Sequence, residues 1–249
     1  DSMRYYKSFL RAGMLSMTPQ TGHVKAWVGG VNFKHFQYDM VKQGKRQVGS
    51  TFKPFVYAAA IDQLHLSPCD TFPKSQITIE AMKYGNVKAW APKNSGGNYG
   101  GYETLKSALA NSRNTITARL MNEIGPQPVI NLARSLGVKQ TIPAVPSIAL
   151  GTPDLSVYEM VAAYGTFANK GVYTKPVMVT RIEDKNGTIL FQNTPETKDV
   201  LSKEVAYVTV KLMEGVTQYG SGQRLRHSSF KNETVYKEII TGYPYLFTN

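Results

Sequence analysis

The hydrophobic pattern of this 249-residue chain is densest between Phe55 and Ile61, where every residue is apolar. A helix that is apolar on nearly all sides is a buried helix rather than a surface helix. We therefore predict a central buried helix from Ser50 to about Gln63, ending before Pro68.

Elsewhere the pattern predicts short strands and helices with one apolar side. Ser156 and Glu159 form a capping box, and Lys185-Asn186-Gly187 is a strong hairpin signal. Strands near both ends of the chain, with helices between them, indicate a mixed α/β domain. The predicted helices are 103–110, 116–124, 127–136, 156–169 and 202–216, and the predicted strands are 14–17, 23–28, 177–183 and 188–191.

The start of the buried helix carries Ser50 and Lys53, three residues apart. This spacing puts a hydroxyl and an amine on one face of one helical turn. The helix dipole and burial both favour the neutral form of the Lys53 amine. A neutral amine can accept the Ser50 proton as a general base, and the Ser50 backbone N–H can donate to an oxyanion. The pair predicts a serine nucleophile that needs no histidine.

The same segment has two other interpretations. A Ser-x-x-Lys pair taken alone is often an N-cap serine followed by a solvated lysine. Gly44 to Thr51 also has the glycine spacing of a phosphate-binding loop. The lysine that should follow the second glycine is replaced by Ser50, which excludes the phosphate-binding interpretation.

A second polar group, Ser112-Arg113-Asn114, falls at the junction of two predicted helices, where side chains can face a cleft. Ser112 is a candidate relay for a proton between Lys53 and a leaving amine. Asn114 is a candidate to hold Lys53 in place and to hydrogen-bond a substrate amide. The alternative is that both residues only cap helices.

Together these segments resemble the transpeptidase domain of bifunctional (class A) penicillin-binding proteins, the serine acyl enzymes that cross-link peptidoglycan. Gln47 to Ala58 is close to the nucleophile segment of that family, and Thr104 to Asn114 matches its second element. Thr18 to Gly30 is similar to the opening hairpin of the domain. Pro146 to Thr152 and Glu159 to Asn169 resemble its later helical region.

The resemblance implies an antiparallel β-sheet covered by helices on both faces. It implies that Ser50 is the acylated nucleophile, that Lys53 is the base, and that Ser112 and Asn114 relay protons and position groups. The implied partners are peptidoglycan stem peptides and, as covalent inhibitors, β-lactam antibiotics. In this family a membrane anchor and a glycosyltransferase domain lie upstream, so the expected location is the periplasmic outer face of the cytoplasmic membrane.

The third element of the family, Lys-Thr-Gly on a central strand, does not occur in this sequence. Lys237 to Gly242 contains Thr-Gly, but the residue before it is Ile240. We expect residues 1–11 to be the end of a linker. We expect residues 12–249 to be a transpeptidase domain that is incomplete at its C-terminus, with an incomplete cleft.

Composition narrows the possible partners. The chain has 29 Lys and Arg against 17 Asp and Glu, a net charge of +12. The basic residues are dispersed and no nucleic-acid motif accompanies them, so we expect no nucleic-acid partner. The four histidines lack metal-ligand spacing and Cys69 is the single cysteine, so we expect no disulfide, metal or cofactor. No run approaches the roughly 20 apolar residues of a membrane-spanning helix.

Two alternatives to a D-Ala-D-Ala transpeptidase remain open. A β-lactamase-like hydrolase on the same scaffold needs a carboxylate that activates water, and the candidates are Glu103, Glu123 and Glu159. A non-catalytic domain that senses β-lactams or acts as an envelope scaffold is the second alternative, which the missing Lys-Thr-Gly favours.

Overall fold

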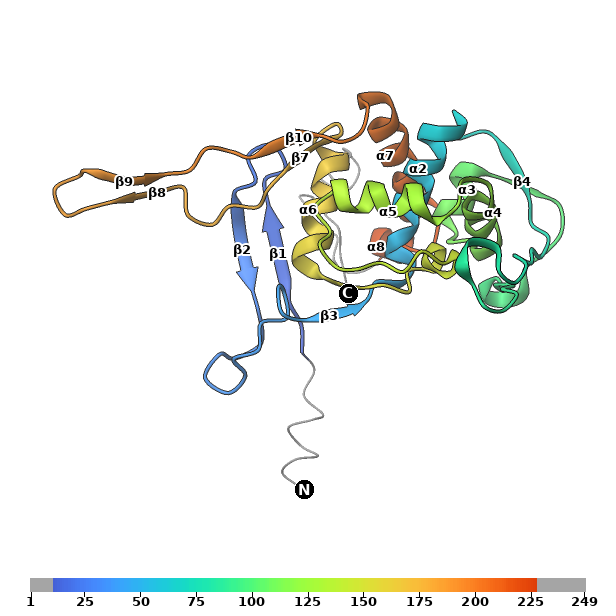
Figure 1. Cartoon of the computed structure of the whole chain (residues 1–249), viewed down its shortest axis with the longest axis horizontal. Helices are drawn as coiled ribbons and strands as arrows, with labels where there is room; N and C mark the ends of the chain where they lie inside the picture. The colour runs from blue at the N-terminus through green and yellow to red at the C-terminus, as the bar shows by residue number, and fades with distance from the viewer. Residues whose placement is uncertain (1–10, 228–249) are drawn as a thin grey trace, which may run out of the picture.

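The computed structural model describes residues 11–227, which form a helical body with a β-ribbon beside it and a long hairpin that projects away (Figure 1). Short 3-10 helices lie in the segments between the longer elements. The α-helices are α2 (Lys53–Leu64), α3 (Leu105–Ala110), α4 (Asn114–Ile124), α5 (Pro126–Ser135), α6 (Val157–Ala168), α7 (Lys203–Gln218) and α8 (Arg224–His227), and the 3-10 helices are η1 (Gly49–Phe52), η2 (Lys83–Gly85), η3 (Ser95–Gly97) and η4 (Pro146–Leu150).

The strands of the described residues form five antiparallel two-stranded ladders. The first is the ribbon beside the body, and the last is the projecting hairpin (Figure 1). The ladders are β1 (Met14–Met17) with β2 (Val24–Val28), β3 (Lys45–Gln47) with β6 (Asp154–Ser156), β4 (Thr71–Pro73) with β5 (Tyr102–Thr104), β7 (Val172–Thr174) with β10 (Thr197–Asp199), and β8 (Arg181–Glu183) with β9 (Ile189–Gln192).

The predicted central helix is confirmed. The chain enters it through η1, and all residues of α2 from Lys53 to Ile61 are buried. Helices α4, α5 and α7 pack around α2. At its start, Phe55 stacks on Phe52 and meets the ring of Tyr164 edge-on, with ring centroids 4.9 and 5.6 Å apart. The hydrophobic core therefore surrounds the helix that carries Lys53.

The ribbon β1–β2 packs against α6 on one side. Leu15, which pairs with Trp27, is buried, and the Trp27 ring lies 5.9 Å from the ring of Tyr158 on α6. Met14 and Val28, which pair on the other side, are about half exposed. The expected mixed α/β class is thus confirmed. Of the helical cover expected on both faces of the sheet, the described residues show α6 on the Leu15 side of the ribbon.

The other predicted helices are present, with one boundary error near the second polar group. The prediction that Glu103 begins a helix is wrong, because Glu103 lies in β5 opposite Phe72. Helix α3 begins only after Thr104, whose hydroxyl oxygen accepts a hydrogen bond from the Ser107 backbone N–H at 3.2 Å. Threonine at an N-cap has an extended backbone, which lets the preceding residue stay in a strand.

The predicted capping box of Ser156 and Glu159 is confirmed at the start of α6. The predicted hairpin around Asn186 is also confirmed, although β8 begins at Arg181 rather than at Val177. The segment Lys237 to Gly242 and residues 1–10 of the expected linker lie outside the described residues.

Candidate active site

Ser50 lies in η1 and is exposed, whereas its neighbour Phe52 is fully buried. Gly49, just before the serine, has φ +56° and donates its N–H to Gly151 O at 2.9 Å. Residues 45–47 pair with residues 154–156 in the β3–β6 ladder, which fixes the chain before the glycine. The strand and the glycine turn therefore bring Ser50 to the surface at the start of a buried helix. As the second residue of η1, Ser50 also has a backbone N–H that the helix does not use.

Lys53 is the first residue of α2 and is only 1% exposed. Its amine donates to three oxygens: the Ser112 carbonyl at 2.7 Å, the Ser112 hydroxyl at 2.8 Å and Asn114 Oδ1 at 2.7 Å. Burial lowers the pKa of the Lys53 amine from 10.5 to about 8. The interpretation of Lys53 as a solvated lysine is wrong, because the side chain is enclosed and fully bonded.

The hydroxyl of Ser112 joins the two residues of the nucleophile motif. It accepts from Lys53 Nζ and donates to Ser50 Oγ at 3.0 Å. Within residues 11–227, no hydrogen bond joins Lys53 Nζ directly to Ser50 Oγ. The polar chain therefore runs from Lys53 through Ser112 to Ser50, so Ser112 stands between the amine and the nucleophile.

Ser112 reaches this position through a left-handed turn at the end of α3. Its φ is +53°, a conformation in which glycine is usual at helix ends. The Ser112 N–H donates to Leu109 O, and the Arg113 N–H donates to Ala108 O, both at 2.9 Å. These two bonds are those of a Schellman motif, with serine in the glycine position. The turn aims the Ser112 hydroxyl back toward α2.

Asn114 is the first residue of α4 and is bonded at both ends of its amide. Its Oδ1 accepts from Lys53, and its Nδ2 donates to the Lys93 carbonyl at 2.8 Å. The N-cap of α4 is Arg113, without a side-chain bond to the helix end. The interpretation of Ser112 and Asn114 as a capping pair is therefore wrong, since both side chains turn toward Lys53.

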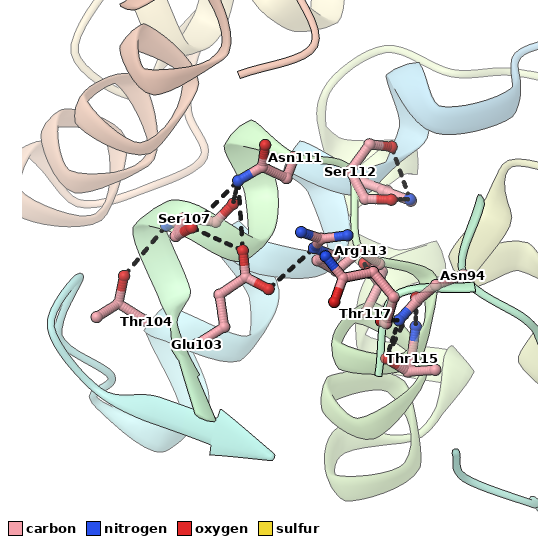
Figure 2. A network of polar contacts seen from close by, with 11 residues as sticks. Asn94, Glu103, Thr104, Ser107, Asn111, Ser112, Arg113, Thr115 and Thr117 are labelled. Atoms are coloured by element: carbon pink, nitrogen blue, oxygen red, sulfur yellow. Dashed lines mark hydrogen bonds and ion pairs between the residues drawn. The ribbon is translucent and has the colours of Figure 1, made fainter. Parts of the chain in front are cut away.

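Contacts that the sequence did not predict support this junction (Figure 2). The buried Asn94 accepts from the Thr115 N–H through Oδ1 and donates to Thr115 Oγ1 through Nδ2, both at 3.1 Å. Arg113 forms an ion pair with Glu103 at 2.9 Å. Asn94 comes from the loop of residues 94–101, and its spacing from Thr115 contains no signal that identifies this contact.

Two aromatic residues, Trp90 and Tyr102, flank this loop in the sequence. Trp90 is partly buried and packs against the hydrophobic core. Tyr102 is 72% exposed. Packing against the core is therefore the role of Trp90.

The carboxylates required by the hydrolase alternative are engaged elsewhere or exposed. Glu159 accepts from the backbone N–H groups of Lys139 and Ser156, and Glu123 is exposed on α4. Among the hydrogen bonds of residues 11–227, none joins Ser50 or Lys53 to a carboxylate. The described part of the chain contains no group of three or more His, Cys, Asp or Glu side chains that could hold a metal ion.

The arrangement agrees with a comparison against protein families. The model of the penicillin-binding protein transpeptidase domain matches residues 12–236. The chain belongs to this family. The resemblance inferred from the sequence is thereby confirmed.

The relatives of this transpeptidase domain include penicillin-binding protein 1A from Neisseria meningitidis, which is 32% identical over 220 residues. Penicillin-binding protein 2D from Bacillus subtilis is 34% identical over 210 residues. These matches cover 86% and 84% of the chain, but only 27% and 30% of the two relatives. The chain thus spans less than a third of the length of the curated relatives it matches.

Among solved structures, penicillin-binding protein 1A from Haemophilus influenzae superimposes with a TM-score of 0.79 at 26% identity. The match covers 88% of this chain and 38% of that one. The penicillin-binding transpeptidase fold inferred from the sequence is therefore confirmed. No helix between residues 11 and 227 has the length and apolar character to span a membrane.

Proposed function

We propose that this domain is a serine D-Ala-D-Ala transpeptidase that forms peptide cross-links in peptidoglycan through an acyl-enzyme on Ser50. The observation that supports it best is the continuous hydrogen-bond chain from Lys53 through Ser112 to the exposed Ser50 hydroxyl. Membership of the penicillin-binding transpeptidase family and the relatives named penicillin-binding protein 1A support the same reaction.

In the first step, Ser50 Oγ attacks the carbonyl carbon of the penultimate D-alanine of a stem peptide. The Ser50 proton moves to Ser112 Oγ while the Ser112 proton moves to the neutral Lys53 amine. This requires the reverse of the donation seen in the structure, where Lys53 donates to Ser112 and Ser112 to Ser50. Deprotonation of Lys53, whose pKa is lowered to about 8, permits that reversal. The Ser50 N–H stabilises the oxyanion.

In the second step, the tetrahedral intermediate collapses, and the bond from the carbonyl carbon to the terminal D-alanine nitrogen breaks. Ser112 returns a proton to that nitrogen and takes one from Lys53, so D-alanine leaves as an amine. An amine of a neighbouring stem peptide then attacks the ester on Ser50. The new amide forms, and the proton of the acceptor amine returns through Ser112 to the Ser50 oxygen. Asn114 holds Lys53 and hydrogen-bonds the substrate amide.

We propose the same function for the whole protein. Stem peptides are its substrates, and β-lactams acylate Ser50 as covalent inhibitors. A membrane anchor and a glycosyltransferase domain precede this domain, which acts in the periplasm at the outer face of the cytoplasmic membrane. The reaction needs no cofactor or nucleic-acid partner.

The first test is intact mass spectrometry after incubation with penicillin, on this chain and on a version extended by its natural downstream sequence. We expect the extended protein to gain the mass of one penicillin molecule, because opening of the β-lactam ring on Ser50 releases no leaving group. Ser50→Ala should abolish the adduct, whereas Ser95→Ala, which changes an exposed serine in the neighbouring loop, should keep it.

The outcomes separate the alternatives. A persistent adduct supports the transpeptidase, whereas rapid loss with turnover of penicillin identifies a β-lactamase-like hydrolase. A folded, extended protein without any adduct contradicts the proposal in favour of a non-catalytic domain. An adduct on the extended protein alone shows that downstream sequence completes the cleft.

A further inference from the structure

One buried carboxylate bonds the residues on both sides of the turn that carries Ser112. Ser112 has a left-handed backbone, which is strained for a residue other than glycine. Such a conformation persists only where its surroundings fix it. The residues on both sides of Ser112 bond the same side chain, Glu103, which lies between Ser107, Asn111 and Arg113 in Figure 2.

Glu103 bonds three residues with its two oxygens. Oε1 accepts from Ser107 Oγ at 2.6 Å and from Asn111 Nδ2 at 3.3 Å. Oε2 accepts from Arg113 Nε at 2.9 Å. Asn111 and Arg113 immediately flank Ser112, so the carboxylate ties down the residue before and the residue after the left-handed turn.

The carboxylate is itself well anchored. Its side chain is 8% exposed, and that of Arg113 is 16% exposed. Glu103 lies in β5, opposite Phe72 of β4, just before the N-cap of α3. Loss of one partner from a buried ion pair is costly, so the carboxylate and Arg113 stay together.

From these contacts we infer that Glu103 is a positioning residue that holds Ser112 in line between Lys53 and Ser50. The inference rests on the proposed function of this site. Glu103 itself bonds neither Ser50 nor Lys53. It acts through Asn111 and Arg113 on the backbone of Ser112, and its engagement there leaves it unsuited to the water-activating role that the hydrolase alternative requires.

The test compares Glu103→Gln with the unchanged extended protein in stopped-flow acylation by a fluorescent penicillin. A glutamine keeps the shape but presents an N–H group or a neutral oxygen to Arg113. Since displacement of a reacting group by about 1 Å can cost about 100-fold, we expect the acylation rate constant to fall about 10- to 100-fold. The dissociation constant of the initial penicillin complex should change little, because Glu103 does not touch the ligand site.

Three variants provide the controls. Glu123→Gln removes an exposed carboxylate from the adjacent helix α4 and should acylate normally. Arg113→Gln breaks the same pair from the other side and should slow acylation as Glu103→Gln does. Arg113→Lys should recover much of the rate, because only one N–H of Arg113, that of Nε, bonds the carboxylate. If Glu103→Gln does not fold, Arg113→Gln and Asn111→Ala test the same support.

A pH profile separates positioning from a simple charge effect. Displacement of Ser112 removes two acceptors from the Lys53 ammonium, which lowers the pKa of Lys53. Positioning therefore predicts that both Glu103→Gln and Arg113→Gln move the rising limb of the acylation profile to lower pH. A charge effect alone moves the rising limbs of the two variants in opposite directions, because Glu103→Gln removes an anion and Arg113→Gln removes a cation.

The outcomes also distinguish this inference from the proposed function. If the unchanged protein is never acylated, the proposed transpeptidase function is rejected. The positioning role of Glu103 is then still tested by the pKa of Lys53 in both variants, measured by NMR of labelled lysine. If the unchanged protein is acylated and Glu103→Gln reacts at the same rate with the same pH profile, the positioning role is overturned. Opposite shifts of the limb in the two variants overturn it as well.

Discussion

At the residue scale, Lys53 couples the stability of the fold to pH. Burial lowers the pKa of its amine from 10.5 to about 8. Between these values the unfolded chain still binds a proton that the folded chain has released, so stability rises with pH. Relative to Lys53→Met, we expect the free energy of unfolding of the unchanged protein to increase by about 2 kcal/mol from pH 7 to about pH 9.5. Urea denaturation across this range measures it.

The comparison with Lys53→Met is needed because other groups titrate nearby. Burial raises the pKa of Tyr57 and Tyr164. These phenols ionise first in the unfolded chain, so they reduce stability above about pH 10 in both proteins. If the difference in the free energy of unfolding between the two proteins stays constant from pH 7 to 9.5, the fold does not lower the pKa of Lys53.

The sequence predicted the reactive residues better than it predicted the contacts that hold them in place. Ser50 and Lys53 are one helical turn apart, so local periodicity is enough to put them together. Ser112 and Asn114 were found as a polar group at a helix junction, but their alignment depends on a left-handed turn that serine rarely adopts. Asn94 and Glu103 act through contacts with distant or differently folded segments, which spacing alone does not reveal.

At the element scale, the site depends on how closely η4 approaches η1. A Cβ on Gly151 would lie 1.8 Å from the Gly49 carbonyl oxygen, and Gly151 has φ +75°. We expect Gly151→Ala to cost about 3 kcal/mol or more, because backbone strain and a backbone clash add. Urea unfolding measures this loss, and penicillin acylation should fall with it because Gly49 precedes Ser50.

Gly187 is the matched control for Gly151. It has a similar φ of +84°, but a Cβ there meets nothing within 4 Å. Gly187→Ala should therefore cost only the conformational strain, about 1 kcal/mol. Equal costs for the two alanine variants would show that the contact between Gly49 and Gly151 does not constrain the helix start.

The longer elements were predictable because their hydrophobic positions follow the period of a helix or a strand. The ladders β3–β6 and β4–β5 were not predicted, since each strand has three residues and its partner is far along the chain. These ladders have direct consequences for the site. The first anchors the segment before Ser50, and the second keeps Glu103 extended so that its carboxylate lies beside α3.

At the scale of the whole molecule, the reactive residues lie where η1, the start of α2 and the junction of α3 and α4 meet. η1 and the start of α2 supply Ser50 and Lys53, and the junction of α3 and α4 supplies Ser112 and Asn114. The β8–β9 arm, residues 181–192, instead extends away from this body (Figure 1). All residues of its two strands are exposed. The arm and the site should therefore be energetically independent.

This independence can be tested by removing the arm. At its base, the Asn193 N–H donates to the Thr180 carbonyl at 2.9 Å, so these two residues already face each other as a strand pair. Replacement of residues 181–192 by Asn-Gly should close the pair with a two-residue turn. We expect the free energy of unfolding to change by less than about 1 kcal/mol, because an isolated hairpin contributes little stability. Penicillin acylation should stay within about twofold, since the shortened protein keeps every contact of Lys53 and Ser112. A tenfold slower reaction in a protein of unchanged stability would show that the arm communicates with the site.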